Sequence, residues 1–233
     1  MMKVDIQIYG VHAREKMAIG LKNSLSLNDD CVHYDDRPNG GLVLYTAKKA
    51  WLAPMPELAT HRIALADDVE VCNNFLEIAD QISIAHPKEI ISFFPYEFMR
   101  KNPDIEDLDT PYFKAHSLCG AAIMMPIEYI QPCFKWIATR FNDNIADDDG
   151  IAYWAKKEGI TILTTIPSLV QHIGDESILE PGRPIRRTVY YENNPIADWS
   201  NKKIMEYRIK EWFFSNHGEL HDVKGVLRVA TEY

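Results

Sequence analysis

The segment over residues 61–70 constrains this sequence most, because it reads as a strand that ends in two carboxylates. Ile63 and Leu65 alternate with small or polar residues, which is the period-2 pattern of a strand. Asp67 and Asp68 follow at its carboxyl end, where a buried carboxylate pair is costly unless positive charge lies beside it. Ligands of open α/β sheets bind at that edge, and divalent cations that hold phosphates commonly use one or two carboxylates. The segment therefore indicates either a metal-diphosphate site or a solvated acidic turn.

Strand-like and helix-like patterns alternate before this segment. Strands are predicted over residues 3–9, 31–34 and 61–66, and helices over 14–26 and 47–51. This β-α-β-α-β order predicts a parallel sheet covered by helices, with a nucleotide-binding crevice at its carboxyl edge. The glycine fingerprint of dinucleotide-binding folds and the phosphate loop of nucleoside triphosphatases are both missing, which argues against those two classes.

The rest of the chain extends the same α/β pattern. Further strands are predicted over residues 90–94, 121–125 and 161–165, and further helices over 71–85, 127–140, 151–159 and about 200–214. We expect one α/β domain over residues 1–180, with a mostly parallel central sheet flanked by helices. Residues 181–233 are expected to form a C-terminal loop and helical extension packed on that domain.

A second acidic centre precedes the helix predicted over residues 151–159. Asp147, Asp148 and Asp149 lie at its start, two lysines lie in its last turn, and Gly159 lies where a C-terminal cap belongs. Acids at a helix start can simply be caps. A capping role for one aspartate and a catalytic role for another are compatible, and both are predicted here.

Composition limits the class of protein and its surroundings. Four cysteines are widely spaced without a CxxC pair, which favours a reducing compartment over a disulfide framework or a zinc knuckle. No apolar run is long enough to cross a bilayer, and residues near the start do not form the apolar core of a signal peptide. The net charge of −9 argues against broad electrostatic binding to nucleic acid. The sequence predicts a cytoplasmic protein without a transmembrane segment.

Several short motifs follow one another along the chain in a particular order. His172 follows an apolar run, where a single histidine is more often structural than a metal ligand. The motifs are Arg14, Asp35 with Asp36, Ala66-Asp67-Asp68, Gly120-Ala121-Ala122, Asp147-Asp148-Asp149, and the Pro-Ser-Leu-Val-Gln-His-Ile-Gly segment over residues 167–174. Together they resemble the nucleotide-sugar-dependent glycosyltransferases of the GT-A (Rossmann-like) fold, which carry a DxD-type metal motif. The resemblance covers residues 3–178, and its most specific part is the segment over 167–174.

This resemblance implies transfer of a sugar from a UDP-sugar with Mn²⁺ or Mg²⁺ as cofactor. Asp68 and His172 are the implied metal ligands, and Asp67 would face the ribose or the sugar of the donor. Ala66 replaces the first acid of the usual motif, so Glu70 is an alternative ligand, and metal-independent relatives also exist. Histidine suits Mn²⁺ better than Ca²⁺.

Other donor contacts and the base follow from the same resemblance. Arg14 would add positive charge near the diphosphate, Asp35 or Asp36 would accept a hydrogen bond from the base, and Gly120 with Ala121 would contact the donor. The acceptor hydroxyl needs a general base on the face opposite the leaving group. Asp148 is the favoured base, followed by Asp149 and then Asp147. If the configuration is retained instead, that carboxylate would bind the acceptor.

The acceptor is expected to be a saccharide or a glycoconjugate. Alternatives are a viral-type DNA glycosyltransferase acting on hydroxymethylated bases, a nucleotide-sugar-binding module without catalysis, and a nucleotidyltransferase, which the missing glycine-rich loop disfavours. Arg183, Arg186 and Arg187 would form either a lid over the diphosphate or a solvated basic loop.

Overall fold

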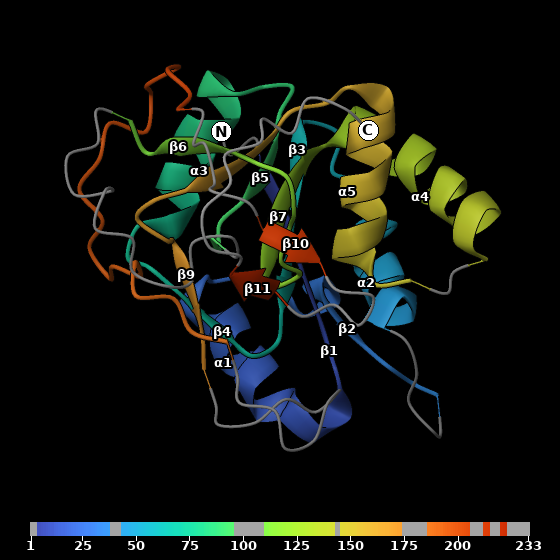
Figure 1. Cartoon of the computed structure of the whole chain (residues 1–233). Helices are drawn as coiled ribbons and strands as arrows, with labels where there is room; N and C mark the ends of the chain where they lie inside the picture. Colours follow the sequence, from blue (N-terminus) through green and yellow to red (C-terminus); the bar gives the residue numbers. More distant parts are fainter. Residues whose placement is uncertain are drawn as a thin grey trace.

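The computed structural model describes residues 4–37, 43–95, 110–142, 145–173 and 186–205, and the backbone of two short strands beyond them. A seven-stranded sheet lies at its centre, in the order β2-β1-β3-β7-β5-β8-β6 (Figure 1). Its strands are β1 (Val4–Gly10), β2 (Val32–Tyr34), β3 (His61–Ala66), β5 (Ile90–Ser92), β6 (Tyr112–Ala115), β7 (Ala122–Pro126) and β8 (Ile162–Thr165). The helices are α1 (Glu15–Ser24), α2 (Val43–Trp51), α3 (Phe75–Ala85), α4 (Ile127–Phe141) and α5 (Asp147–Glu158), with 3₁₀ turns η1 (His12–Arg14) and η2 (Asp29–Cys31).

The sheet is mixed, with most of its strands pointing the same way. β1 pairs in parallel with β2 and β3, and β5 pairs in parallel with β8. β7 runs antiparallel between β3 and β5, and β6 runs antiparallel along the edge of β8. The predicted α/β class and flanking helices are confirmed. The strand predicted over residues 121–125 breaks the parallel order. This strand, β7, lies between β3 and β5 and runs opposite to both of them.

Alternation along the strands divides the core into two layers. Ile63 and Leu65 of β3 pack in one apolar cluster with α1 and α3, while Ala64 packs in the other with α2, α4 and α5. Figure 1 shows these two groups of helices on opposite faces of the sheet. Because β1 pairs in parallel with β2 and β3, the carboxyl ends of these three strands share one edge of the sheet, and this edge carries Asp67 and Asp68.

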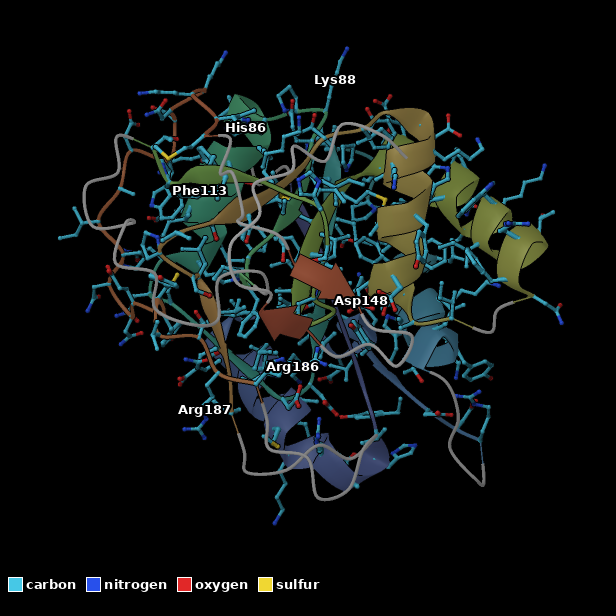
Figure 2. The ribbon with its side chains drawn as sticks, in the orientation of Figure 1. His86, Lys88, Phe113, Asp148, Arg186 and Arg187 are labelled. Carbon is cyan, nitrogen blue, oxygen red and sulfur yellow. The ribbon has the colours of Figure 1, made fainter. Side chains whose placement is uncertain are left out.

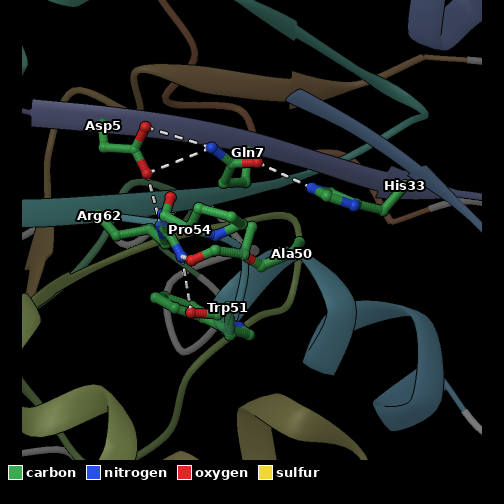
Figure 3. Close-up of polar contacts among 8 residues, drawn as sticks. Asp5, Gln7, His33, Ala50, Trp51, Pro54 and Arg62 are labelled. Atoms are coloured by element: carbon green, nitrogen blue, oxygen red, sulfur yellow. Dashed lines mark hydrogen bonds and ion pairs between the residues drawn. The ribbon is translucent and has the colours of Figure 1, made fainter. Parts of the chain in front are cut away.

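A buried arginine ties two layers together. Arg62 on β3 is fully buried, and its Nε donates to Asp5 on the neighbouring strand β1. Its two terminal nitrogens donate to backbone carbonyls at and just after the end of α2, and Figure 3 shows these contacts. The distances are 3.2 Å to Ala50, 2.8 Å to Trp51, 2.8 Å to Ala53 and 2.8 Å to Pro54. Arg62 thus supplies donors to carbonyls that a helix end leaves without partners and places a cation at its negative end.

Most predicted elements lie where the local patterns indicate. α4 confirms the helix expected over residues 127–140, and Gly159 caps α5 with a φ of 68°. The helix expected over residues 151–159 begins earlier than predicted, at Asp147. The predicted N-cap role of an aspartate is wrong, because the three aspartates lie inside the first turn and the N-cap residue is Ala146, which offers no side-chain hydrogen bond. α3 begins at Phe75 instead of residue 71, because residues 69–71 form a short strand. That strand, β4 (Val69–Val71), pairs antiparallel with β9 (Val170–His172) as a separate two-stranded ribbon.

The helix expected over about residues 200–214 is wrong for the residues described there. Residues 201–204 have no regular structure, and Met205 forms a bridge with Phe113 of β6. Its backbone N–H donates to Tyr112 and its carbonyl accepts from Lys114, so pairing with the sheet edge replaces helical hydrogen bonds. β10 (Trp212–Phe214) pairs antiparallel with β11 (Leu220–Asp222). In the part of the chain that the structure describes, no helix has the length and apolar character needed to cross a bilayer.

Candidate functional site

Asp67 is fixed where β1 and β3 end. Its Oδ2 accepts the backbone N–H of Val11 at 2.9 Å, and its Oδ1 lies 3.2 Å from Nη1 of Arg14. A Cβ on Gly10 would lie 2.0 Å from Oδ2, so the carboxylate packs directly on the glycine backbone. Asp67 therefore holds the loop after β1 against the end of β3. A side chain at position 10 would displace it.

Asp68 contacts two cationic side chains. Its Oδ2 lies 2.6 Å from Nη1 of Arg14, and its Oδ1 lies 3.5 Å from Nδ1 of His172. The β4–β9 ribbon makes this contact possible, since Val69 pairs with His172 and the carbonyl of Asp68 accepts the N–H of Ile173 at 2.8 Å. The structure thus brings together both predicted metal ligands and Arg14, from three separate parts of the sequence.

The charges at this edge of the sheet shift the pKa of each group. Burial and the neighbouring Asp68 raise the pKa of Asp67 to about 6, against the hydrogen bonds from Val11 and Arg14. Burial would also raise the pKa of Asp68, but the contact with His172 and the charge of Arg14 outweigh it and lower the pKa. Burial would lower the pKa of His172, but its contacts with Asp68 and Cys119 raise the pKa to about 9. At neutral pH the negative charges of the two aspartates are therefore balanced by the positive charges of Arg14 and His172.

The donor set at Asp68 fits a metal only if another molecule supplies the remaining ligands. Nδ1 of His172 is buried without a hydrogen bond among the described residues, and the ring of Phe94 lies 5.2 Å from its own ring. Within the described ranges, no three His, Cys, Asp or Glu side chains lie together in a way that could hold a metal. Two protein ligands completed by phosphate oxygens and water is the usual arrangement for a cation that binds with a nucleotide.

Glu70, the alternative ligand, is placed elsewhere. Its side chain is exposed on β4, facing the opposite way from the buried Val69, and its charge adds to the burial that raises the pKa of Tyr191. The structure therefore separates Glu70 from the contact between Asp68 and His172.

The three aspartates at the start of α5 have different surroundings. Asp147 is buried, with Oδ2 accepting the indole N–H of Trp51 at 3.2 Å and Oδ1 left without a partner among the described residues. Asp148 accepts the backbone N–H of Gly120 at 3.0 Å and that of Asp149 at 2.9 Å. Asp149 is exposed. Of the three, Asp148 is both held in place and partly accessible, as a base must be.

Burial and charge raise the pKa values of these aspartates as well. The pKa of Asp148 is raised by burial and by Asp149, and the nearby charge of Arg186 opposes this shift. Figure 2 shows Asp148 near the start of α5. It also labels Arg186 and Arg187, which come after β9 in the sequence. Arg183 lies outside the described residues, so both alternatives for the three arginines, a solvated basic loop or a lid, remain predictions. A carboxylate with a raised pKa is a better base than an ordinary one.

Tyr9 connects the two acidic centres, and the sequence did not single it out. Its hydroxyl donates to the carbonyl of Gly120, whose N–H donates to Asp148. A Cβ on Gly120 would lie 2.9 Å from that hydroxyl. Burial raises the pKa of Tyr9 well above its ordinary value, and so do the charges of Asp147, Asp148 and Asp68. A tyrosine at the carboxyl end of a strand, on the same side as polar residues, was the available signal.

Ala121 contributes backbone to the same strand end. It is buried, and its carbonyl accepts the N–H of Ala66 at 3.0 Å. The backbone of Gly120 and Ala121 therefore joins the end of β3, through the N–H of Ala66, to the start of α5, through the side chain of Asp148.

Asp35 and Asp36 lie at the carboxyl end of β2 but do not join the contact between Asp68 and His172. Asp35 accepts the Nε and Nη2 of Arg37 at 2.9 and 2.7 Å. Asp36 accepts the hydroxyl of Tyr45 at 3.1 Å and lies 3.0 Å from Nζ of Lys49. Both carboxylates already have donors, so a base N–H would have to share them.

A second feature missed by the sequence lies at the same end of β2. The rings of His12 and Tyr34 stack with centroids 4.7 Å apart. Neither side chain follows a motif, and only the parallel pairing of β1 with β2 brings them together.

The raised pKa of Asp147 predicts how the stability of the fold depends on pH. Burial and Asp148 raise its pKa to about 7, while the unfolded chain has a value of about 4. Because the folded state then binds more protons, this group's contribution is complete below about pH 4 and is lost as the pH rises through about 7. We expect Asp147→Asn to flatten the decline between pH 5 and 8, measured as urea midpoints. Asp30→Asn, at an exposed site, is the control, and an unchanged decline in Asp147→Asn would contradict the prediction.

No protein-family model matches the chain, and no curated protein matches it with significance.

Proposed function

We propose that this protein is a glycosyltransferase that moves a sugar from a UDP-sugar to an acceptor hydroxyl with a divalent metal, with inversion at the transferred carbon. The observation that carries the proposal is the contact of Asp68 with His172 at 3.5 Å, at the carboxyl edge of the sheet. These are the two ligands that the resemblance to GT-A glycosyltransferases implies. The ordering of Asp148 by Gly120 supports the acceptor side of the same proposal.

On the donor side, each residue has a role that its contacts support. Asp68 and His172 would hold Mn²⁺ or Mg²⁺, which when bound stabilises the negative charge on the departing diphosphate. Arg14 lies beside the same carboxylates and would pair with a diphosphate oxygen. Asp67 keeps the loop after β1 in place through Val11. It therefore acts on the donor by shaping the site.

On the acceptor side, Asp148 would take the proton of the attacking hydroxyl. Two backbone N–H groups fix the direction of its carboxylate, and burial raises its pKa toward the range where a base is efficient. Asp147 lies behind it against Trp51, which suits a supporting role. The acceptor class supported by the resemblance is a saccharide or a glycoconjugate.

Calorimetry with UDP and Mn²⁺ tests the donor site. We expect wild-type protein to bind UDP in the presence of Mn²⁺, and Asp68→Ala to weaken that binding by about 100-fold or more, beyond the 10- to 100-fold loss typical of a supporting residue. Asp30→Ala removes the same side chain from an exposed position and should bind as wild type. Undiminished binding by Asp68→Ala would overturn the metal assignment.

A second measurement separates an enzyme from a binding module. UDP release from a panel of UDP-hexoses, followed by chromatography, should require both Mn²⁺ and Asp68. Binding of UDP without any release, with water, simple saccharides or hydroxymethylated DNA as acceptor, would favour the module.

A further inference from the structure

Arg14 lies between the two carboxylates of the donor site. One nitrogen, Nη1, is 2.6 Å from Oδ2 of Asp68 and 3.2 Å from Oδ1 of Asp67. The side chains are largely buried, with exposed fractions of 15% for Arg14, 4% for Asp67 and 10% for Asp68. A guanidinium keeps its charge throughout the physiological range. A cation that keeps its charge therefore lies beside this pair as part of the chain.

The two carboxylates differ in how firmly the fold holds them. Asp67 accepts the N–H of Val11 through Oδ2, which also packs on the backbone of Gly10, so the fold holds this carboxylate by contacts other than the one between its Oδ1 and Arg14. Asp68 has side-chain contacts with Arg14 and His172, and the β4–β9 ribbon holds its carbonyl. Asp68 is consequently the carboxylate that can exchange one cation for another.

A metal that binds alone meets a cation already in place. Arg14 occupies Oδ2 of the same carboxylate that would ligate the metal, and two positive charges within a few ångströms in a partly buried site repel each other. A diphosphate removes this conflict, since its oxygens give the guanidinium a new bidentate partner and also complete the shell of the metal.

We infer that Arg14 is the counter-ion that Asp68 exchanges for the metal, and that the guanidinium moves to the diphosphate, so that metal and nucleotide bind as a pair. The inference rests on the proposed function and adds a binding order to it. The metal alone binds weakly, and the nucleotide strengthens its binding by releasing Arg14 from Asp68.

Electron paramagnetic resonance of free Mn²⁺ measures this coupling without turnover, once the Mn²⁺ bound by UDP in the absence of protein has been subtracted. Mn²⁺ affinity is determined with and without saturating UDP for wild type and for Arg14→Gln, which removes the charge but keeps a polar side chain. We expect Arg14→Gln to bind Mn²⁺ alone about tenfold more tightly than wild type, and the gain from UDP to shrink by a similar factor. Lys16→Gln removes one positive charge from an exposed site two residues away and should leave both affinities unchanged.

The outcomes separate this inference from the proposed function. Wild-type protein that binds neither Mn²⁺ nor UDP would overturn both. Wild-type protein that binds Mn²⁺ with UDP, together with an Arg14→Gln variant showing the same coupling or weaker binding of Mn²⁺ alone, would overturn the inference only. Wild type supplies a test that needs no variant, since equal Mn²⁺ affinities with and without UDP would also overturn it.

Discussion

Replacing Arg62 by methionine is expected to lower the free energy of unfolding by about 3–5 kcal/mol, the usual cost of removing one partner from a buried ion pair. Methionine retains much of the apolar stem, so the loss comes mainly from the guanidinium. Asp5 would keep a nearly buried charge without its cation, and carbonyls at the end of α2 would lose their donors. Equilibrium unfolding in urea, followed by circular dichroism, measures the change.

Two further variants show which property of Arg62 matters. Arg62→Lys keeps the charge but cannot reach Asp5 and several carbonyls at once, so an intermediate loss is expected. Arg140→Met removes an exposed arginine from α4 and should change stability by less than about 0.5 kcal/mol. A loss below about 1 kcal/mol in Arg62→Met would show that the rest of the fold, or water, replaces these contacts.

Asp148→Asn should lower the rate of sugar transfer by about 10²- to 10⁴-fold, the contribution typical of a positioned base. Asparagine has nearly the same shape and keeps a carbonyl oxygen for the N–H of Gly120, and it gives up only the hydrogen bond from the N–H of Asp149, so the fold and UDP binding should survive. The measurement pairs UDP release from UDP-hexoses with calorimetry of UDP and Mn²⁺. A loss of rate with unchanged binding would assign the defect to the chemical step.

Asp149→Asn is the matched control, because it makes the same change at the exposed neighbouring residue. Its expected loss is below tenfold. A larger loss in Asp149→Asn than in Asp148→Asn would move the base to Asp149. A wild-type rate in Asp148→Asn would remove its role as base and favour a retaining reaction, in which this carboxylate binds the acceptor.

Local patterns predicted the elements whose signals are local. The lysines and Gly159 of α5 specify its end without reference to the rest of the chain, whereas the acids indicate only roughly where it starts, since they lie inside its first turn instead of before it. The direction of β7 was not predictable in this way, because a continuous apolar run such as residues 122–126 suits either direction in a sheet. The helix predicted over residues 71–85 begins too early for a related reason, since the three residues of β4 carry too little periodicity to reveal pairing with a distant partner.

The candidate site was predictable where charge marks a strand end. Asp67, Asp68 and Arg14 follow strands β3 and β1, and parallel pairing alone brings such ends together. Tyr9 was missed because a tyrosine in a strand suits core packing equally well. The ion pair of Asp35 with Arg37 could not be foreseen either, because it depends on side-chain direction in a loop.

The pairing of β4 with β9 also determines when the site can form. Val69 and His172 become neighbours only after the chain between them, which contains β5, β7 and β8, has closed into one long loop. Contacts between residues so far apart in the sequence are expected to form late in folding, because closing the long loop costs entropy before the contact stabilises the chain. A nascent chain that has not reached residue 172 would carry both aspartates beside Arg14 but lack the histidine. The contact between Asp68 and His172, on which the proposed metal site depends, is thus expected to form late in folding.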